Sequence, residues 1–238
     1  MPRPPSTPVF VLVPGASQSP AHYGLLMHLL LTRGHPVYSA ILPSTGPGNA
    51  KNVTAQVDAD GIPGSAAAYG LGKKDREAAG KKTSVLGQIY IAALLVKGGD
   101  GGNIVDALGG SLPPHITPDV RTSRILTCAD PGPPLYSDVT PLLFQNAIVN
   151  STLCPSYASW HSPCPRASWD QESFKGKIAF IRTLNDTGIP LHFQDMFMQN
   201  TGEEWIVRDM HTGHSPQLVQ PERVCDVLIE LARGFGGV

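Results

Sequence analysis

The chain has 238 residues, of which 41% are hydrophobic and 16% are charged, and its formal net charge is -1 at pH 7. A chain of this length and composition has enough apolar side chains for one hydrophobic core, so we expect a single domain. The near-neutral charge argues against a nucleic-acid partner and against an anionic membrane surface. No apolar run reaches the roughly 18 residues that a membrane-spanning helix needs.

The N-terminus and the cysteines bear on the cellular compartment. Residues 1–8 are rich in proline and lack the apolar segment of a secretory signal. The cysteines form no C-x-x-C pair and no zinc-ligand pattern. They are Cys128, Cys154, Cys164 and Cys225. We therefore predict a cytoplasmic protein with reduced thiols and without a bound metal.

Apolar runs and helical spacing predict alternating strands and helices in the first part of the chain. Val9–Val13 is rich in β-branched residues, which predicts a parallel strand buried on both faces. A helix is predicted at 20–33 and a second strand at 36–42, so this part forms a βαβ unit with a right-handed crossover. A loop is predicted at 43–52 and a short helix at 53–60.

The pattern continues with a helix at 65–79 and a strand at 85–95. Residues 97–175 are rich in proline and glycine and too numerous for an ordinary loop, so we predict a partly helical cap inserted there. Strand, helix, strand and helix then follow at 177–184, 190–199, 204–209 and 221–235. The order predicts an α/β fold, with a mostly parallel sheet flanked by helices, as one domain over 1–238.

Two polar residues follow the last two predicted strands. Asp186 comes just after the strand at 177–184, and His214 lies in the loop after the strand at 204–209. Ligands of open α/β sheets bind at the carboxyl ends of the strands. An acid that accepts a hydrogen bond from an imidazole fixes its tautomer and stabilises the imidazolium during acyl transfer. Their order therefore predicts an acid–base pair, and His211 more simply ends the preceding strand.

Four motifs occur in order along the chain: FVLVPGA at 10–16, GHPV with LPSTG at 34–46, YIAA at 90–93, and GHSP at 213–216. Together they resemble the plant-esterase and hydroxynitrile-lyase branch of the α/β-hydrolase superfamily and its fungal relatives. The resemblance covers nearly the whole chain. It implies the α/β-hydrolase fold, catalytic roles for Asp186 and His214, and an oxyanion-hole N–H at Ala16. It also implies small esters or lactones as substrates, with no cofactor.

The nucleophile of that family lies on a strand-to-helix turn, G-x-S-x-G, which should fall between the second strand and Tyr90. None of the serines in that interval has glycines at both required positions. The serines considered are Ser44, Ser65 and Ser84. The resemblance implies that about 30 residues, the length of one βα unit, are absent between Asp60 and Gly61. A true deletion and a faulty gene model both explain this junction.

Ser17 and Trp160 are the remaining candidates for the substrate pocket. Ser17 follows the oxyanion turn, and Trp160 lies among cap aromatics that either line an apolar pocket or pack within the cap. We predict an ancestral serine esterase or lactonase, impaired by loss of its nucleophile. One alternative is a catalytically inactive pseudoenzyme that binds a small apolar ligand or a partner. Another is a hydroxynitrile-lyase-like or cyclase activity that uses His214 without an acyl-enzyme.

Overall fold

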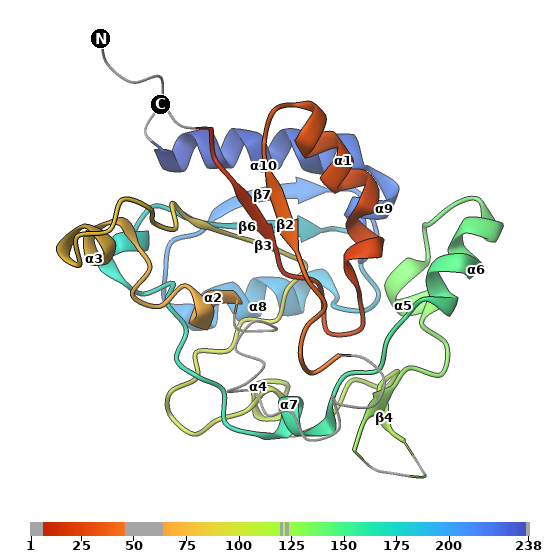
Figure 1. Cartoon of the computed structure of the whole chain (residues 1–238). Coiled ribbons are helices and arrows are strands. Elements are labelled where there is room, and N and C mark those ends of the chain that lie inside the picture. The colour runs from red at the N-terminus through yellow and green to blue at the C-terminus, as the bar shows by residue number, and fades with distance from the viewer. Residues whose placement is uncertain (1–6, 46–63, 120, 122–123, 237–238) are drawn as a thin grey trace.

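The computed structural model describes residues 7–45, 64–119, 121 and 124–236, and its strands and helices alternate along the chain (Figure 1). The strands are β1 (Phe10–Leu12), β2 (Val37–Ser39), β3 (Gln88–Ile91), β4 (Thr117–Pro118), β5 (Leu126–Thr127), β6 (Ile178–Thr183) and β7 (Ile206–Met210). The first helices are η1 (Pro20–Tyr23), α1 (Gly24–Thr32), α2 (Gly64–Ala67), α3 (Lys73–Ala78), α4 (Ile104–Ala107) and α5 (Gly132–Tyr136). The others are α6 (Leu142–Asn150), α7 (Tyr157–His161), η3 (Glu172–Phe174), α8 (Leu191–Thr201), α9 (Pro216–Val219) and α10 (Pro221–Gly236).

The long strands form two separate parallel sheets. One contains β1 and β2, and the other has the order β3-β6-β7. A short antiparallel pair, β4 with β5, lies within residues 97–175, for which we keep the name cap. Parallel strands flanked by helices confirm the predicted α/β class. In the described ranges, β1 pairs only with β2 and β3 only with β6, so each has one edge without a strand beside it.

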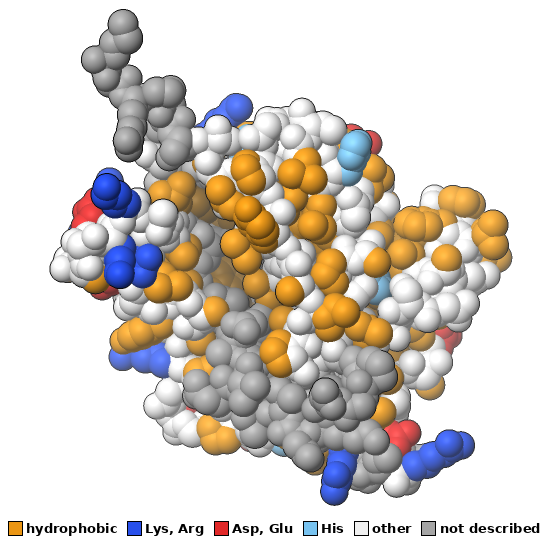
Figure 2. Space-filling model, in the orientation of Figure 1, with side chains coloured by type: hydrophobic (Ala, Val, Ile, Leu, Met, Phe, Trp, Pro, Cys, Tyr) orange, Lys and Arg blue, Asp and Glu red, His pale blue; other side chains and the backbone are white. Residues whose placement is uncertain are grey.

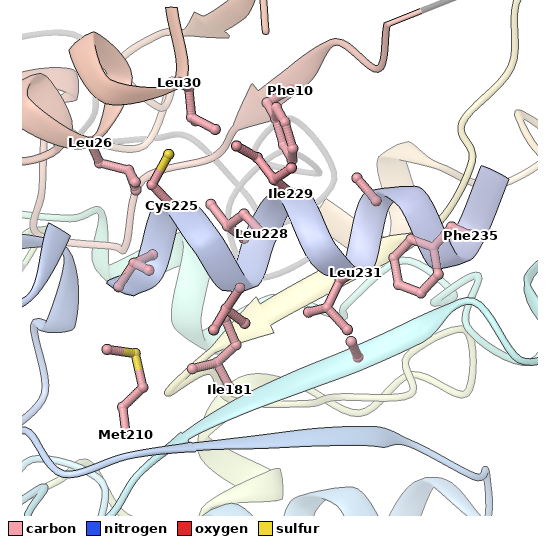
Figure 3. Close-up of a cluster of buried hydrophobic side chains, with 14 residues drawn as sticks. Phe10, Leu26, Leu30, Ile181, Met210, Cys225, Leu228, Ile229, Leu231 and Phe235 are labelled. Atoms are coloured by element: carbon pink, nitrogen blue, oxygen red, sulfur yellow. The ribbon is translucent and has the colours of Figure 1, made fainter. Parts of the chain in front are cut away.

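Helix α10 holds the main hydrophobic core together. Its apolar residues recur at helical spacing, and nine of its side chains are buried. Figure 3 shows this helix between Phe10, Leu26 and Leu30 on one side and Ile181 with Met210 on the other. The two sheets therefore share one covering helix although their strands do not pair with each other.

The opposite face of β1 departs from the sequence prediction. Phe10 is buried against the core, but Val9, Val11 and Val13 are 54%, 72% and 38% exposed. The neighbouring strand presents Tyr38 on the same side, at 65% exposed. Figure 2 shows hydrophobic side chains gathered over the region of β1 and β2. The prediction of a strand buried on both faces was wrong, because no helix of the described ranges covers the second face of the β1–β2 pair.

This asymmetry gives opposite expectations for two neighbours on β1. Replacing Phe10 with alanine empties a core position and should lower the free energy of unfolding by about 3 kcal/mol. Val11→Thr keeps the shape and β-branching of a side chain that lies mostly in water, so it should change that free energy by less than about 0.5 kcal/mol. Urea unfolding of both variants measures the difference. Equal losses would mean that the Val11 face is covered in solution.

Two other predictions are refined by the structure. The helix expected at 65–79 is divided into α2 and α3, because Gly70 takes a left-handed conformation with φ of +69° and ends the first piece. The described part of the cap contains five short helices (α4, α5, α6, α7 and η3) and the β4–β5 pair, with loops between them.

The predicted loop and helix at 46–60, and the junction of Asp60 with Gly61, lie outside the described residues. No helix in the described ranges is long and apolar enough to cross a membrane.

Candidate active site

The pairing of β6 with β7 brings the two predicted catalytic loops together. These strands are parallel neighbours, and the register sets Thr183 opposite Met210 at their carboxyl ends. The loops that follow are joined by backbone hydrogen bonds from Leu184 N–H to the Met210 carbonyl (2.9 Å) and from Asn185 N–H to the Thr212 carbonyl (3.1 Å). Asp186 and His214 come next on their respective loops.

Asp186 is buried and accepts hydrogen bonds on both carboxylate oxygens. Oδ1 accepts the N–H groups of Gly188 (2.8 Å) and Ile189 (2.9 Å), and Oδ2 accepts the Thr183 hydroxyl (2.8 Å). Burial alone raises the pKa of this carboxyl. The hydrogen bond and charge of His214, with the bonds from Ile189 and Thr183, outweigh burial and hold the pKa below its usual value. Asp186 is therefore an anion at neutral pH.

His214 lies against that anion, with its Nδ1 2.8 Å from Oδ2 of Asp186. An ionised carboxylate can only accept, so Nδ1 carries the proton, and in the neutral ring Nε2 carries the lone pair. This is the tautomer of a general base whose second nitrogen is oriented by an acid. The side chain of His214 is 20% exposed, whereas that of Asp186 is fully buried.

A buried glutamine, not foreseen from the sequence, braces the acid. Gln194 of α8 accepts the Thr183 N–H (3.1 Å) and donates to the carbonyls of Thr183 (3.0 Å) and Ile189 (2.8 Å). It also donates to the Thr183 hydroxyl (3.1 Å), which in turn donates to Asp186. The network fixes both ends of the acid loop. A glutamine in an amphipathic helix gives no sign of this contact in the sequence.

The turn after β1 lies beside the histidine loop. Gln18 donates to the hydroxyl of Ser215, the residue after His214, over 3.4 Å, and the Gly15 N–H donates to the hydroxyl of Tyr23 (3.2 Å). The Ala16 carbonyl is held by the Thr45 hydroxyl (2.9 Å), while its N–H donates to no described residue. The turn is thus joined to the histidine loop through Gln18 and Ser215, and the role of Ala16 and Ser17 at the site stays a prediction.

Solved structures similar to this chain match its fold over almost its whole length. Polyneuridine aldehyde esterase has a TM-score of 0.70 at 16% identity, with 95% of this chain and 100% of that chain covered. A pyrethroid hydrolase from Sphingobium faniae has a TM-score of 0.67 at 19% identity, with 95% and 97% covered. The chain has the α/β-hydrolase fold. Tomato methylketone synthase I shares it, at 14% identity, a TM-score of 0.63, and 97% and 99% coverage. No protein-family model and no curated protein matches the sequence.

In an α/β-hydrolase fold, the hydroxyl to be activated should lie beside the second nitrogen of the histidine. Among the described residues, no side chain or backbone group forms a hydrogen bond with Nε2 of His214. Ser17 follows the oxyanion turn, and Ser215 is fully buried beside Gln18, but neither forms a bond to that nitrogen. In the described part of the site, His214 is therefore oriented by Asp186 and has no hydroxyl bonded to its second ring nitrogen.

A second serine–histidine contact, between Ser151 and His22, is not arranged to activate a serine. The Ser19 N–H donates to Nδ1 of His22 (3.1 Å), so the proton of the neutral ring is on Nε2, which donates to the Ser151 hydroxyl (3.3 Å). Burial lowers the pKa of His22 and favours this neutral form. Because Nε2 already carries a proton, His22 cannot take one from Ser151. The Ser151 hydroxyl donates instead to the carbonyl of Ile148 at the end of α6 (2.8 Å).

Two cap residues complete the surroundings of the site. Trp160 is 4% exposed and belongs to an apolar cluster against which Ala16 packs, so its role in a substrate pocket stays a prediction. Half-buried His115 was missed by the sequence reasoning. Burial lowers its pKa, the charge of His214 lowers it further, and Asp186 opposes both, which places this ring within the field of the pair. In the described ranges, no group of three His, Cys, Asp or Glu side chains is arranged to hold a metal ion.

Proposed function

We propose that this chain descends from α/β-hydrolase esterases that cleave small carboxylic esters or lactones, and that it has lost the serine nucleophile. The observation that carries the proposal is the His214–Asp186 bond of 2.8 Å, with Nε2 of the same ring unpartnered among the described residues. The names of similar structures, a pyrethroid hydrolase and polyneuridine aldehyde esterase, support an ester as the ancestral substrate. On this proposal, the plant-esterase branch is the source of the chain.

In an intact relative, the remaining groups would have defined roles. Nε2 of His214 would take the proton of a serine hydroxyl as it attacks the ester carbonyl, and would later return it to the leaving alcohol. Asp186 would stabilise the imidazolium between these steps. The Ala16 N–H would donate to the oxygen that becomes negative in the tetrahedral intermediate. Without the serine, no covalent intermediate forms and the other groups have nothing to activate.

The division of the sheet supports the loss of a whole strand and not of one side chain. A strand between the open edges of β1 and β3 would join the two sheets in the order β2-β1-new strand-β3-β6-β7. The two sheets are already placed for this, because both pack against α10. A helix after that strand would have a bare apolar surface to cover, the face with Val9, Val11 and Val13. The gap in the motif series between Asp60 and Gly61 falls at the matching place in the chain.

A hydrolysis assay with p-nitrophenyl acetate tests the proposal. We expect the purified chain to release nitrophenol at the same slow rate as its His214→Ala variant, without a burst, because exposed side chains alone react with this activated ester. Saturation kinetics that disappear in His214→Ala would show a functional nucleophile and would contradict the proposed loss.

A second candidate function is binding of a small apolar ligand by a catalytically inactive protein. The apolar cluster around Trp160 favours it, because partly buried hydrophobic side chains, one of them in the oxyanion turn, pack against this cluster. They include Ala16, Leu94, Leu112 and Ile116. The apolar probe 2-tridecanone carries no group that the chain could hydrolyse. It should bind His214→Ala with the affinity it has for the unaltered chain, and it should bind Ile116→Asp more weakly. Absence of binding to the unaltered chain would eliminate this candidate.

A further inference from the structure

One short segment of the cap, residues 133–138, contacts both catalytic loops; it spans most of α5 and the two residues that follow it. On the acid side, the Thr187 hydroxyl donates to the carbonyl of Pro133 (2.8 Å). On the histidine side, the Gly213 N–H donates to Oδ2 of Asp138 (2.6 Å). A segment remote in sequence from both loops therefore joins the residue after Asp186 to the residue before His214.

The approach is close enough to require glycine on both loops. A Cβ atom at Gly188 would lie 2.7 Å from the carbonyl oxygen of Pro134, and one at Gly213 would lie 2.7 Å from Oδ1 of Asp138. Neither glycine has a positive φ, so backbone conformation does not explain their presence. The close approach of the cap segment explains why both positions are glycine.

The segment itself is firmly held. Tyr136 is fully buried, stacks on His22 with ring centroids 6.1 Å apart, and accepts the hydroxyl of Thr152 (3.4 Å). The side-chain amide of Gln145 donates to the Tyr136 carbonyl (2.6 Å). A mobile segment could not fix the position of a loop, and these contacts give α5 a rigid base.

We propose that Asp138 is a positioning residue, which holds the Gly213 amide and thereby keeps the His214 ring in place against Asp186. Its second oxygen, Oδ1, is buried and accepts no hydrogen bond from the described residues. Among those residues, the Gly213 N–H is therefore the hydrogen-bond partner of the carboxylate. A hydrogen bond from a backbone N–H to a carboxylate is stronger than a hydrogen bond between two neutral groups. The role of Asp138 in catalysis rests on the proposed function, whereas its hydrogen bond to Gly213 is independent of that function.

The test follows the Nδ1 proton of His214 by nuclear magnetic resonance in histidine-labelled protein, because this readout needs no catalytic activity. We expect Asp138→Ala to increase the exchange of that proton with solvent at least tenfold. Asp138→Asn, which keeps an acceptor oxygen, should stay within twofold of the unaltered chain. Asp100→Ala is the matched control, because Asp100 also accepts a glycine N–H, that of Gly102 (2.9 Å), in a different loop.

A double-mutant cycle measures the contact between Asp138 and Gly213 through stability, independently of proton exchange; if Asp138→Ala fails to fold, Asp138→Asn remains the variant for the exchange measurement. The Gly213→Ala methyl group collides with Oδ1 of Asp138, so removal of that carboxylate should relieve part of the damage. The urea midpoint of Gly213→Ala/Asp138→Ala should therefore be higher than the sum of the single changes predicts. An exchange rate within twofold of the unaltered chain in Asp138→Ala, or strict additivity in the cycle, would overturn the proposal. Turnover by the unaltered chain would contradict the proposed function and leave this test intact.

Discussion

Insertion of a strand–turn–helix segment with the pattern G-x-S-x-G between Asp60 and Gly61 is expected to give the chain esterase activity. The acid–base pair and the Ala16 turn are already in place, so the new serine would meet an oriented base. Removal of a serine nucleophile typically reduces turnover by several orders of magnitude, so the gain in kcat/KM toward p-nitrophenyl acetate should be about 10³-fold or more.

The same segment with alanine in place of serine is the control for this insertion. It should fold and stay inactive, and both inserted chains should unfold at a higher temperature than the unaltered chain, because the edges of β1 and β3 gain a partner. Activity that depends on the new serine but survives His214→Ala would contradict the assigned base. A rise in stability without activity would support the missing strand and contradict the proposed chemistry.

Replacing Asp186 with alanine is expected to destabilise the folded chain strongly. The change leaves the donors of Thr183, Gly188, Ile189 and His214 without their acceptor in a buried site, and should lower the free energy of unfolding by about 3 kcal/mol. Asp186→Asn keeps one acceptor oxygen and should cost about half as much. Urea unfolding at neutral pH measures both.

The pH dependence of stability follows from the same carboxylate. Its pKa in the folded chain lies below the value of about 3.9 in an unfolded chain. The stabilisation is therefore fully present above about pH 4, and it is lost as the pH falls through the folded-state pKa. The unaltered chain should lose stability more steeply than Asp186→Asn when the pH is lowered from 5 to 3. Parallel curves would mean that Asp186 is not stabilised as an anion.

The acid–base pair was predictable because its signals are local. Apolar runs located β6 and β7, and strands in sequence order with a helix between them pair in parallel. The carboxyl ends of paired parallel strands lie at one edge of the sheet, and the bond between Asp186 and His214 follows from that. The structure places His214 against Asp186, whereas His211 is exposed directly after β7.

The contacts that the sequence did not indicate are those between distant segments. The run Val9–Val13 has the composition of a central strand, but composition cannot count the helices that will cover it, so the exposure of Val11 was not foreseen. Gln194 and Asp138 lie in segments whose periodicity says nothing of the loops they hold. Their partners are set by packing of the cap and of α8, which only the folded chain reveals.

Reaction with a fluorophosphonate probe, followed by the mass of the intact protein, is the most direct measurement of the central claim. Such probes form a covalent adduct with a serine that a histidine activates. The chain described here should gain no mass under conditions in which the chain with the inserted serine segment is fully labelled. A single stoichiometric adduct on the unaltered chain, lost in His214→Ala, would show that the base already has its hydroxyl.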